Sequence, residues 1–158
     1  MQSTDHTVRM TQSCLFCSII NNKIPAVIIY EDENFVALMD KYPINHGHSL
    51  VIPRSHHESL LSMTPSEVGK LYSIVSTVSK AVISAVNADG FSIGQNNGRA
   101  ANQIIPHVHV HIIPRYAGDS REGKWPSRTI GNTQELTITS QKIRSVLLAR
   151  TDIRVHEP

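Results

Sequence analysis

The stretch Pro106-His107-Val108-His109-Val110-His111-Ile112-Ile113-Pro114 decides the fold, because three histidines alternate in it with branched apolar residues. This alternation predicts a β-strand over 107–114, since successive side chains of a strand point to opposite faces. The apolar face anchors the strand on a core. The histidine face is either the polar face of a half-buried strand or a functional surface. Three of the nine histidines lie here, and imidazole suits nucleophilic, acid–base and metal chemistry near neutral pH, so we favour the functional interpretation.

The spacing of the histidines limits which of these kinds of chemistry the three side chains can share. A strand rises about 3.3 Å per residue, which places His107 and His109 roughly 7 Å apart and His107 and His111 roughly 13 Å apart. A zinc ion holds its nitrogen ligands at about 2.0–2.1 Å. The three imidazoles therefore cannot easily share one ion, and a row at this spacing better suits an extended substrate such as a phosphate chain.

The composition describes one domain of ordinary size. The chain has 158 residues, of which 40% are hydrophobic and 18% charged, and its net charge is +2. Acidic and basic residues are interspersed without a Lys/Arg run, so the sequence does not indicate nucleic-acid binding. The apolar stretches are too short to cross a membrane, and the amino terminus is too polar for a signal peptide. We expect a cytoplasmic protein with no membrane partner.

The two cysteines form a closely spaced pair, Cys14-Leu15-Phe16-Cys17. In a cytosolic chain this spacing indicates metal binding or redox chemistry more often than a structural disulfide. A redox pair would follow a strand, whereas here a polar segment precedes it. We favour zinc over a ligand-free pair. Two thiolates fill half of a tetrahedral site, so two further ligands, which we expect to be histidines, must come from elsewhere.

Strands and helices are expected in the order helix, three strands, long helix, two strands and closing helix. The long helix begins with a capping box at Thr64-Pro65-Ser66-Glu67 and carries an apolar stripe to Val86. We expect it to cover one face of an antiparallel sheet, which is an α+β fold. The other predicted elements are a short helix at 16–22, strands at 26–30, 35–39, 48–53, 91–95 and 107–114, and a closing helix at 139–150.

These residues resemble the histidine triad (HIT) family. His107-Val108-His109-Val110-His111 matches its His-x-His-x-His motif, and Gly47-His48-Ser49-Leu50-Val51-Ile52-Pro53 resembles its other signature strand. Together with the cysteine pair, the match is to the Hint-like, zinc-containing bacterial type. It extends from about Cys14 to Pro126. The resemblance implies a five-stranded antiparallel sheet with one long helix, and a homodimer with a continuous ten-stranded sheet.

The resemblance implies that the protein is a nucleotidyl hydrolase. His109 would attack the α-phosphorus of a purine nucleotide derivative and form a covalent nucleotidyl-imidazole that water then cleaves. His111 would donate to a phosphate oxygen or to the leaving group, and His48 would support the nucleophile. A related transferase branch has Gln at the position of His111, so histidine here favours hydrolysis. The substrate would be an adenosine phosphoramidate, a nucleotide ester or a dinucleoside polyphosphate.

Further positions match residues that bind the nucleotide in this family. Asp40 matches the carboxylate that accepts from the ribose hydroxyls, and the less favoured alternative is an ordinary turn residue. Asn96 matches an amide that contacts the nucleotide or the catalytic strand, with Asn97 leaving the register open by one. The apolar wall for the base would comprise Leu15, Phe16, Ile19 and Leu50, which could equally be simple core.

In similar proteins the cysteine pair, a histidine after the signature strand and the first triad histidine bind one structural zinc ion. Here these are Cys14, Cys17, His56 and His107, with His57 as the neighbour that could be mistaken for His56. Such a closed tetrahedral site leaves no position for chemistry. It would stiffen the catalytic strand by tying it to the amino-terminal segment.

The chain also departs from the family pattern. Ile104 stands where many Hint-type proteins have Ser, which puts a preference for phosphoramidates in doubt, and the segment after Trp125-Pro126 is longer than expected. We expect a disordered tail over 1–12 and one domain over 13–158, with a carboxyl-terminal extension after about 126. Two other interpretations stay open: a nucleotide-binding regulatory or adaptor protein with incidental hydrolysis, and a zinc-binding interaction module.

Overall fold

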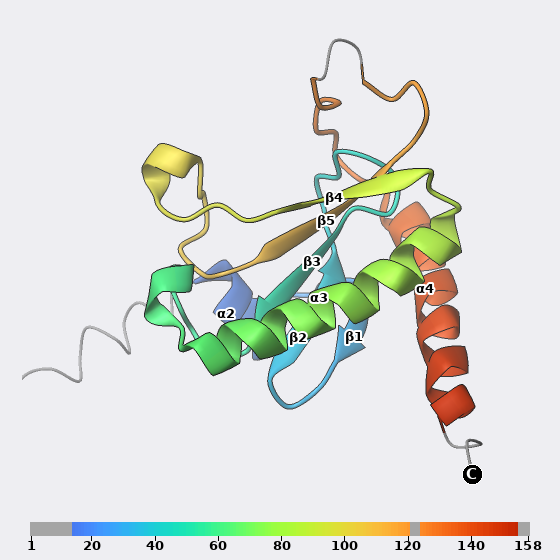
Figure 1. Cartoon of the computed structure of the whole chain (residues 1–158). Helices are drawn as coiled ribbons and strands as arrows, with labels where there is room; N and C mark the ends of the chain where they lie inside the picture. The colour runs from blue at the N-terminus through green and yellow to red at the C-terminus, as the bar shows by residue number, and fades with distance from the viewer. Residues whose placement is uncertain (1–13, 121–123, 155–158) are drawn as a thin grey trace, which may run out of the picture.

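The computed structural model describes residues 14–120 and 124–154 of the chain (Figure 1). The predicted tail over 1–12 lies outside the described residues. In chain order the helices and strands are α2 (Leu15–Ile20), β1 (Ile28–Glu31), β2 (Phe35–Met39), β3 (Ser49–Pro53), η1 (Leu60–Ser62), α3 (Pro65–Val86), β4 (Gly90–Gly94), η2 (Arg99–Ala101), β5 (Val110–Arg115) and α4 (Thr133–Arg154).

The strands form a single five-stranded sheet in the order β1-β2-β3-β5-β4. Each neighbouring pair is antiparallel, so the predicted α+β fold with an antiparallel sheet is confirmed. β5 lies between β3 and β4, and Leu50 of β3 pairs with His111 of β5. This pairing brings the two stretches that the sequence singled out onto neighbouring strands.

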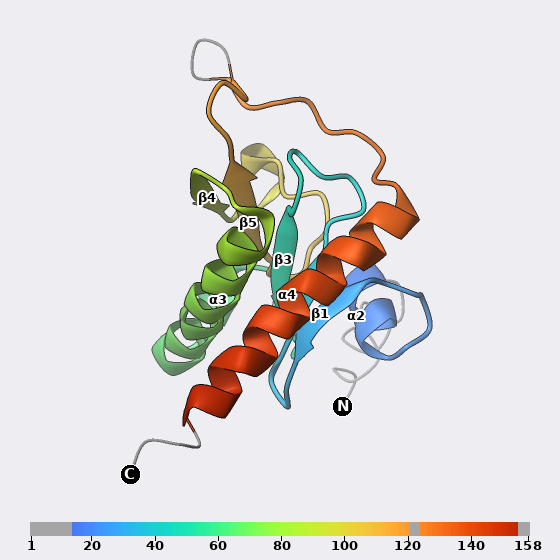
Figure 2. The same ribbon diagram turned by 90° about the vertical axis from the view of Figure 1, so that its right-hand side faces the viewer.

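Helices cover the sheet on both faces (Figure 2). α3 and α4 lie side by side on one face, where Val108, Val110 and Ile112 join the core beneath them. On the other face the short helix α2 packs Phe16 against Leu50 and its neighbours on β2 and β3. The histidine face is therefore enclosed rather than presented to solvent: His107 is fully buried, and His109 is 8% exposed.

The strand that carries the histidines is shorter than predicted, since it begins at Val110 rather than at His107. Pro106 has no N–H to offer a neighbouring strand. The N–H of Val108 donates to the carbonyl of His57 at 2.7 Å, so the backbone here binds the loop after β3. The side chains nevertheless alternate as expected, with Val108 and Val110 on the α3 side.

The long helix α3 has the bounds that its capping box predicts. The Thr64 hydroxyl accepts from the N–H of Glu67, and the Glu67 carboxylate accepts from the N–H of Thr64. The closing helix α4 is longer than the predicted 139–150. It begins at Thr133, because the side chain of Asn132 accepts from the N–H groups of Gln134 and Glu135 and acts as an N-cap.

One glycine fixes the entry to β3. Gly47 has φ +87°, and a Cβ there would lie 3.0 Å from Val86 Cγ1 and 3.1 Å from Pro114 Cγ. A side chain would therefore be strained by the backbone conformation and crowded by its neighbours. Gly47 thus sets the position of His48, the next residue. Among the described residues, no helix has the length and apolar character needed to span a membrane.

Candidate active site

His107 lies among two cysteines and a second histidine. Its Nδ1 is 3.4 Å from Cys14 Sγ and 3.6 Å from Cys17 Sγ, and His56 Nδ1 is 3.3 Å from Cys17 Sγ. The four ligand atoms all lie within 4.8 Å of one another. A tetrahedral ion with Zn–S near 2.3 Å and Zn–N near 2.0 Å separates sulfur from nitrogen by about 3.5 Å. The spacing of the four side chains therefore fits a zinc ion.

The tautomer of His107 also fits a metal ligand. Its Nε2 lies 2.8 Å from the carbonyl oxygen of Pro53. A carbonyl can only accept, so Nε2 carries the proton and Nδ1 offers its lone pair to the cluster. Burial lowers the pKa of His107 to about 4, which keeps the ring neutral. A hydrogen bond of this kind on the outer nitrogen is how proteins orient metal-bound histidines.

The sequence assigns His56, rather than the adjoining His57, to this cluster, and the structure places His56 there. His57 turns toward the first turn of α3, where its Nε2 lies 3.5 Å from Glu67 Oε1. In the absence of metal, burial and the neighbouring Cys14 raise the pKa of Cys17 to about 11. A cation between the sulfurs would favour the thiolates that ligate it.

His109 has one ring nitrogen committed to the backbone and one left over. Its Nδ1 is 2.7 Å from the carbonyl oxygen of His107, so Nδ1 carries a proton and donates it. Burial lowers the pKa of His109, which leaves Nε2 unprotonated with an available lone pair. The Phe16 ring packs against this imidazole with ring centroids 5.0 Å apart. These two contacts hold the His109 imidazole in position and leave its Nε2 unprotonated and able to act as a nucleophile.

His48 and His111 form a short hydrogen-bonded relay. The N–H of Ile44 donates to His48 Nδ1 at 3.0 Å, so the proton of His48 is on Nε2. That nitrogen lies 2.9 Å from His111 Nδ1 and donates to it, which leaves the proton of His111 on Nε2. Burial lowers the pKa of His48 to about 4 and that of His111 to about 3. His111 can therefore donate from Nε2 at neutral pH. The sequence predicts that His48 supports the nucleophile, and in the structure the hydrogen-bond partner of its Nε2 is His111.

Asp40 lies at the end of this relay and is nearly buried. Its Oδ2 is 3.4 Å from His48 Nε2 and 3.9 Å from His111 Nδ1. Its Oδ1 accepts from the N–H of Tyr42. Its Oδ2 also accepts from Arg128 Nη1 at 3.0 Å. Sequence reasoning missed Arg128, since one arginine in an unmatched extension carries no periodic signal.

The predicted apolar wall is mostly core. Phe16 and Leu50 are buried, Ile19 is half-buried beside them, and Leu15 is 42% exposed. Asn96 is exposed, and its amide donates to the carbonyl of Asn102. The neighbouring Asn97 accepts from the N–H of Leu60 at 2.7 Å, so its side chain binds the segment before α3. Of the predicted wall residues, Phe16 lies beside the triad histidines, and Leu15 lies at the surface.

The fold and the site together define a class of protein. Its antiparallel sheet carries an imidazole with a free ring nitrogen, here His109, beside a cluster of cysteines and histidines that can hold a metal ion. A HIT domain model matches residues 21–118, and the chain belongs to this family. It is 39% identical over 121 residues to a protein of Arabidopsis thaliana named adenylylsulfatase HINT3, a match that covers 77% of this chain. The chain spans 60% of that relative's length.

Two further matches cover more of both chains. A protein of Schizosaccharomyces pombe named adenosine 5'-monophosphoramidase hnt1 is 34% identical over 134 residues, which cover 84% of this chain and 97% of the relative. The crystal structure of a Zn-bound histidine triad protein from Mycobacterium smegmatis superposes with a TM-score of 0.79 at 32% identity. It covers 90% of this chain, and this chain covers 99% of it.

Proposed function

We propose that this protein is a nucleotidyl hydrolase that cleaves purine nucleotide derivatives at the α-phosphate through a covalent intermediate on His109. The observation that carries the proposal is the hydrogen bond from His109 Nδ1 to the carbonyl of His107. It leaves Nε2 as an uncharged nucleophile in a buried site, which is the requirement for covalent catalysis by imidazole.

The reaction has two displacements on phosphorus. In the first, the lone pair of His109 Nε2 forms a bond to the α-phosphorus while the bond to the leaving group breaks and its electron pair departs. The leaving group takes a proton from solvent. His111 Nε2–H donates a hydrogen bond to the developing negative charge. In the second, water attacks the phosphorus, its proton passes to solvent, and the electron pair of the P–N bond returns to His109 Nε2.

The same proposal assigns the other predicted residues. His48 holds His111 in the donating tautomer. Leu15, Phe16, Ile19 and Leu50 contact the base, and Asp40 and Asn96 contact the nucleotide. The names of the two relatives support an adenosine derivative with a sulfate or an amine as leaving group. The free cysteines support a cytosolic location, where thiols stay reduced.

One structural zinc ion belongs to this proposal. It would be held by Cys14, Cys17, His56 and His107 and would supply four metal–ligand bonds that fix the backbone leading into β5. Because His107 also accepts the hydrogen bond of His109 through its carbonyl oxygen, the metal site would hold the nucleophile in place without touching the substrate.

The function is tested with His109→Ala. We expect adenosine phosphoramidate turnover to fall by several orders of magnitude, because the nucleophile is removed, while AMP affinity stays near that of the wild type. Rates on adenosine phosphoramidate, adenylyl sulfate and diadenosine tetraphosphate, measured side by side, identify the leaving group. Mass spectrometry after rapid quenching should detect the nucleotidyl adduct in the wild type.

The matched control for this variant is His57→Ala, which removes a histidine outside the relay and the cluster. It should leave turnover near the wild-type rate. Turnover in His109→Ala at the wild-type rate would refute the nucleophile. A wild-type protein that binds AMP but turns over none of these substrates would support the adaptor interpretation instead.

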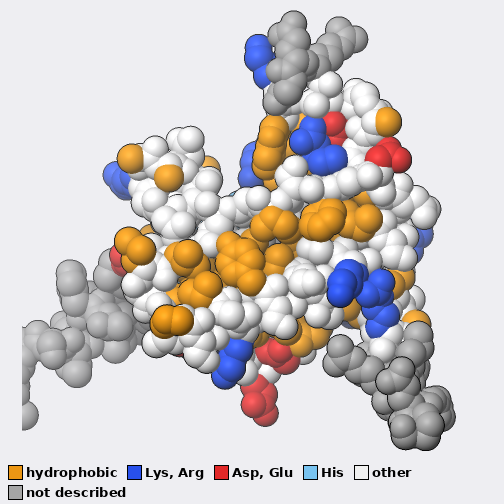
Figure 3. Space-filling model, in the orientation of Figure 1, with side chains coloured by type: hydrophobic (Ala, Val, Ile, Leu, Met, Phe, Trp, Pro, Cys, Tyr) orange, Lys and Arg blue, Asp and Glu red, His pale blue; other side chains and the backbone are white. Residues whose placement is uncertain are grey.

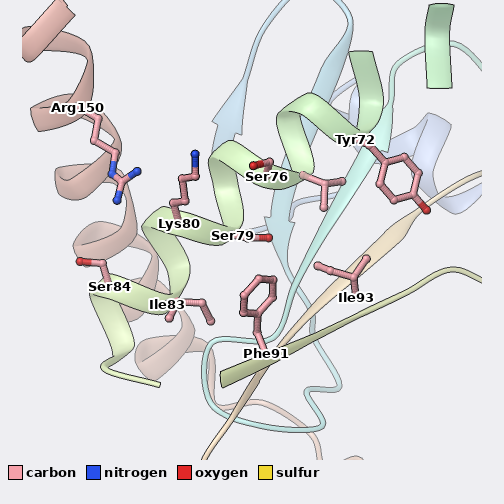
Figure 4. A pocket seen from close by; sticks show the side chains of 10 residues that line it. Tyr72, Ser76, Ser79, Lys80, Ile83, Ser84, Phe91, Ile93 and Arg150 are labelled. Carbon is pink, nitrogen blue, oxygen red and sulfur yellow. The ribbon is translucent and has the colours of Figure 1, made fainter. Parts of the chain in front are cut away.

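We further propose that the protein is a homodimer joined through β4. β4 is an edge strand of the sheet, and it exposes Phe91 and Ile93. A groove of about 580 Å³ lies between this strand and α3 (Figure 4), with Tyr72 at one end and Arg150 at the other. Hydrophobic side chains gather along this side of the molecule (Figure 3). Pairing of β4 with its copy would continue the sheet and cover this surface.

A further inference from the structure

Arg128 is the charged side chain at the triad that the mechanism above does not use. Its Nη1 donates to Asp40 Oδ2 at 3.0 Å and to the carbonyl oxygen of Tyr42 at 2.8 Å. An Nη group carries two hydrogens, so these two bonds occupy Nη1 completely. The two hydrogen bonds of Nη1 thereby fix the position of the guanidinium group.

The position of Arg128 is set by the backbone around it. The N–H of Thr129 donates to the carbonyl of Pro43 at 3.2 Å, and the N–H of Gly131 donates to the carbonyl of Lys41 at 2.8 Å. The residues just before α4 therefore lie against the loop that follows Asp40. Arg128 reaches the site because this segment is attached there, and not through a chance side-chain conformation.

The remaining donors of Arg128 are free for a ligand. Among the residues that the structure describes, its Nε and Nη2 groups donate to no protein acceptor, and the side chain is 45% exposed. The Asp40 oxygen that it binds lies 3.4 Å from His48 Nε2 and 3.9 Å from His111 Nδ1. A half-exposed guanidinium with a free donor edge, next to catalytic imidazoles, matches the geometry with which arginine binds phosphate.

The charge of Arg128 also reaches the imidazoles. It contributes to the lowered pKa of His48, His109 and His111, although burial is the largest cause for each. A cation that favours the neutral form of these rings would equally favour an anionic substrate beside them. The alternative is a purely structural ion pair with Asp40, in which the remaining N–H donors of Arg128 would bind only water.

We propose that Arg128 binds the phosphate groups of the substrate and that Asp40 orients it for this task. The inference rests on the proposed nucleotide function and adds a residue to it from the carboxyl-terminal segment of the same chain. Asp40 then contributes to phosphate binding through Arg128, in addition to any contact with the ribose.

The test compares two ligands that differ only in the phosphate. Calorimetric titration of AMP and of adenosine is carried out on the full chain as wild type, Arg128→Gln, Arg128→Lys and Arg144→Gln. We expect Arg128→Gln to weaken AMP binding by about tenfold or more and to leave adenosine binding within about twofold. Arg128→Lys keeps the charge without the planar fork, so its AMP affinity should lie between the two.

Arg144→Gln is the matched control, because Arg144 anchors the same carboxyl-terminal region to the carbonyl of Ile28 at a distance from the triad. It should bind AMP as the wild type does. In steady-state kinetics, Arg128→Gln should raise KM more than it lowers kcat. Equal AMP affinity in Arg128→Gln and wild type would overturn the inference. An equal loss for AMP and adenosine would overturn it too, since Arg128 would then only shape the pocket.

These results separate the inference from the proposed function. If the wild type hydrolyses a nucleotide substrate and Arg128→Gln does so with unchanged KM, this inference alone is wrong. If the wild type neither binds AMP nor turns over any of the three substrates, the proposed function is wrong, and the proposed role of Arg128 is then wrong too.

Discussion

Each histidine of the triad is held in one tautomer by a different partner. His107 donates from Nε2 to a carbonyl, His109 donates from Nδ1 to a carbonyl, and His111 accepts at Nδ1 from His48. Under the proposed function, the ring nitrogen left over would ligate zinc in His107, attack phosphorus in His109 and donate a hydrogen bond in His111. One type of side chain could thus perform three tasks, because a backbone carbonyl fixes the proton of His107 and of His109 and the His48 side chain fixes that of His111.

Burial of these imidazoles predicts that the protein loses stability in acid. The pKa of His48 is lowered to about 4 and that of His111 to about 3, below the ordinary 6.5. As the pH falls through this window the unfolded chain takes up protons that the folded chain refuses, so the free energy of unfolding decreases. Denaturant melts at pH 7.0 and pH 5.0 should show a lower midpoint at pH 5.0.

Two variants check the source of this pH dependence. His48→Asn should shrink the difference between the two midpoints, because it removes one of the buried imidazoles. His46→Gln changes an exposed histidine nearby and should leave the difference as it is. Equal midpoints at the two pH values in the wild type would contradict the argument.

At the level of single residues, the sequence predicted that the three histidines share one face of a strand, but not which residues surround them. Alternation places His107, His109 and His111 on one face, and resemblance to the family gives each a role. Arg128 could not be found in this way, because its contact with Asp40 joins residues 88 positions apart and depends on how an extension folds back. Nor could the sequence predict that His48 contacts His111.

Among the elements, the metal-type cluster of Cys14, Cys17, His56 and His107 joins three segments that lie far apart in the sequence. Cys14 and Cys17 come from the start of α2, His56 from the loop after β3, and His107 from the approach to β5. The approach to β5 has no sheet partner of its own, since Val108 binds the carbonyl of His57. A metal ion here would replace the missing strand pairing.

This arrangement predicts that zinc removal lowers stability and activity together. Cys14→Ser should bind less than the wild-type zinc content, which we expect to be about one equivalent per chain, and should melt at a lower temperature. Its turnover should also fall, because the carbonyl that holds His109 belongs to His107, one of the four proposed zinc ligands. Elemental analysis, thermal melts and phosphoramidate rates measure the three effects.

Thr64→Ala is the control for a general loss of stability. It removes the N-cap of α3 and should cost about 1 kcal/mol, while zinc content and turnover stay as in the wild type. A wild-type protein that contains no zinc and has the same melting temperature as the Cys14→Ser variant would contradict the zinc proposal.

Prediction from the sequence was most accurate for elements whose ends are marked by capping residues or by a clear apolar period. The bounds of α3 follow from its capping box and its stripe of apolar residues. β5 starts three residues later than its alternation predicts, because Pro106 and the bond from Val108 to His57 divert the backbone. The first turns of α4 were missed because its cap, Asn132, precedes a stretch without a clear apolar period.

On the scale of the whole molecule, the groove between α3 and β4 predicts self-association. Phe91→Glu should convert a dimer to a monomer in light scattering coupled to gel filtration, because it places a charge on the proposed interface. Leu61→Glu alters a side chain that is 93% exposed elsewhere and should remain dimeric. A monomeric wild type at micromolar concentration would refute the dimer.

The two edges of the sheet are not equivalent, and this limits how large an assembly can grow. Along β1, α4 packs against the strand and Arg144 occupies the carbonyl of Ile28, so this edge is protected from further pairing. β4 lies at the opposite edge. When two copies meet through β4, the combined sheet ends at both sides in a protected β1. In the proposed dimer, growth of the sheet would therefore stop at two copies, and the exposed hydrophobic edge strand β4 would not lead to a fibre.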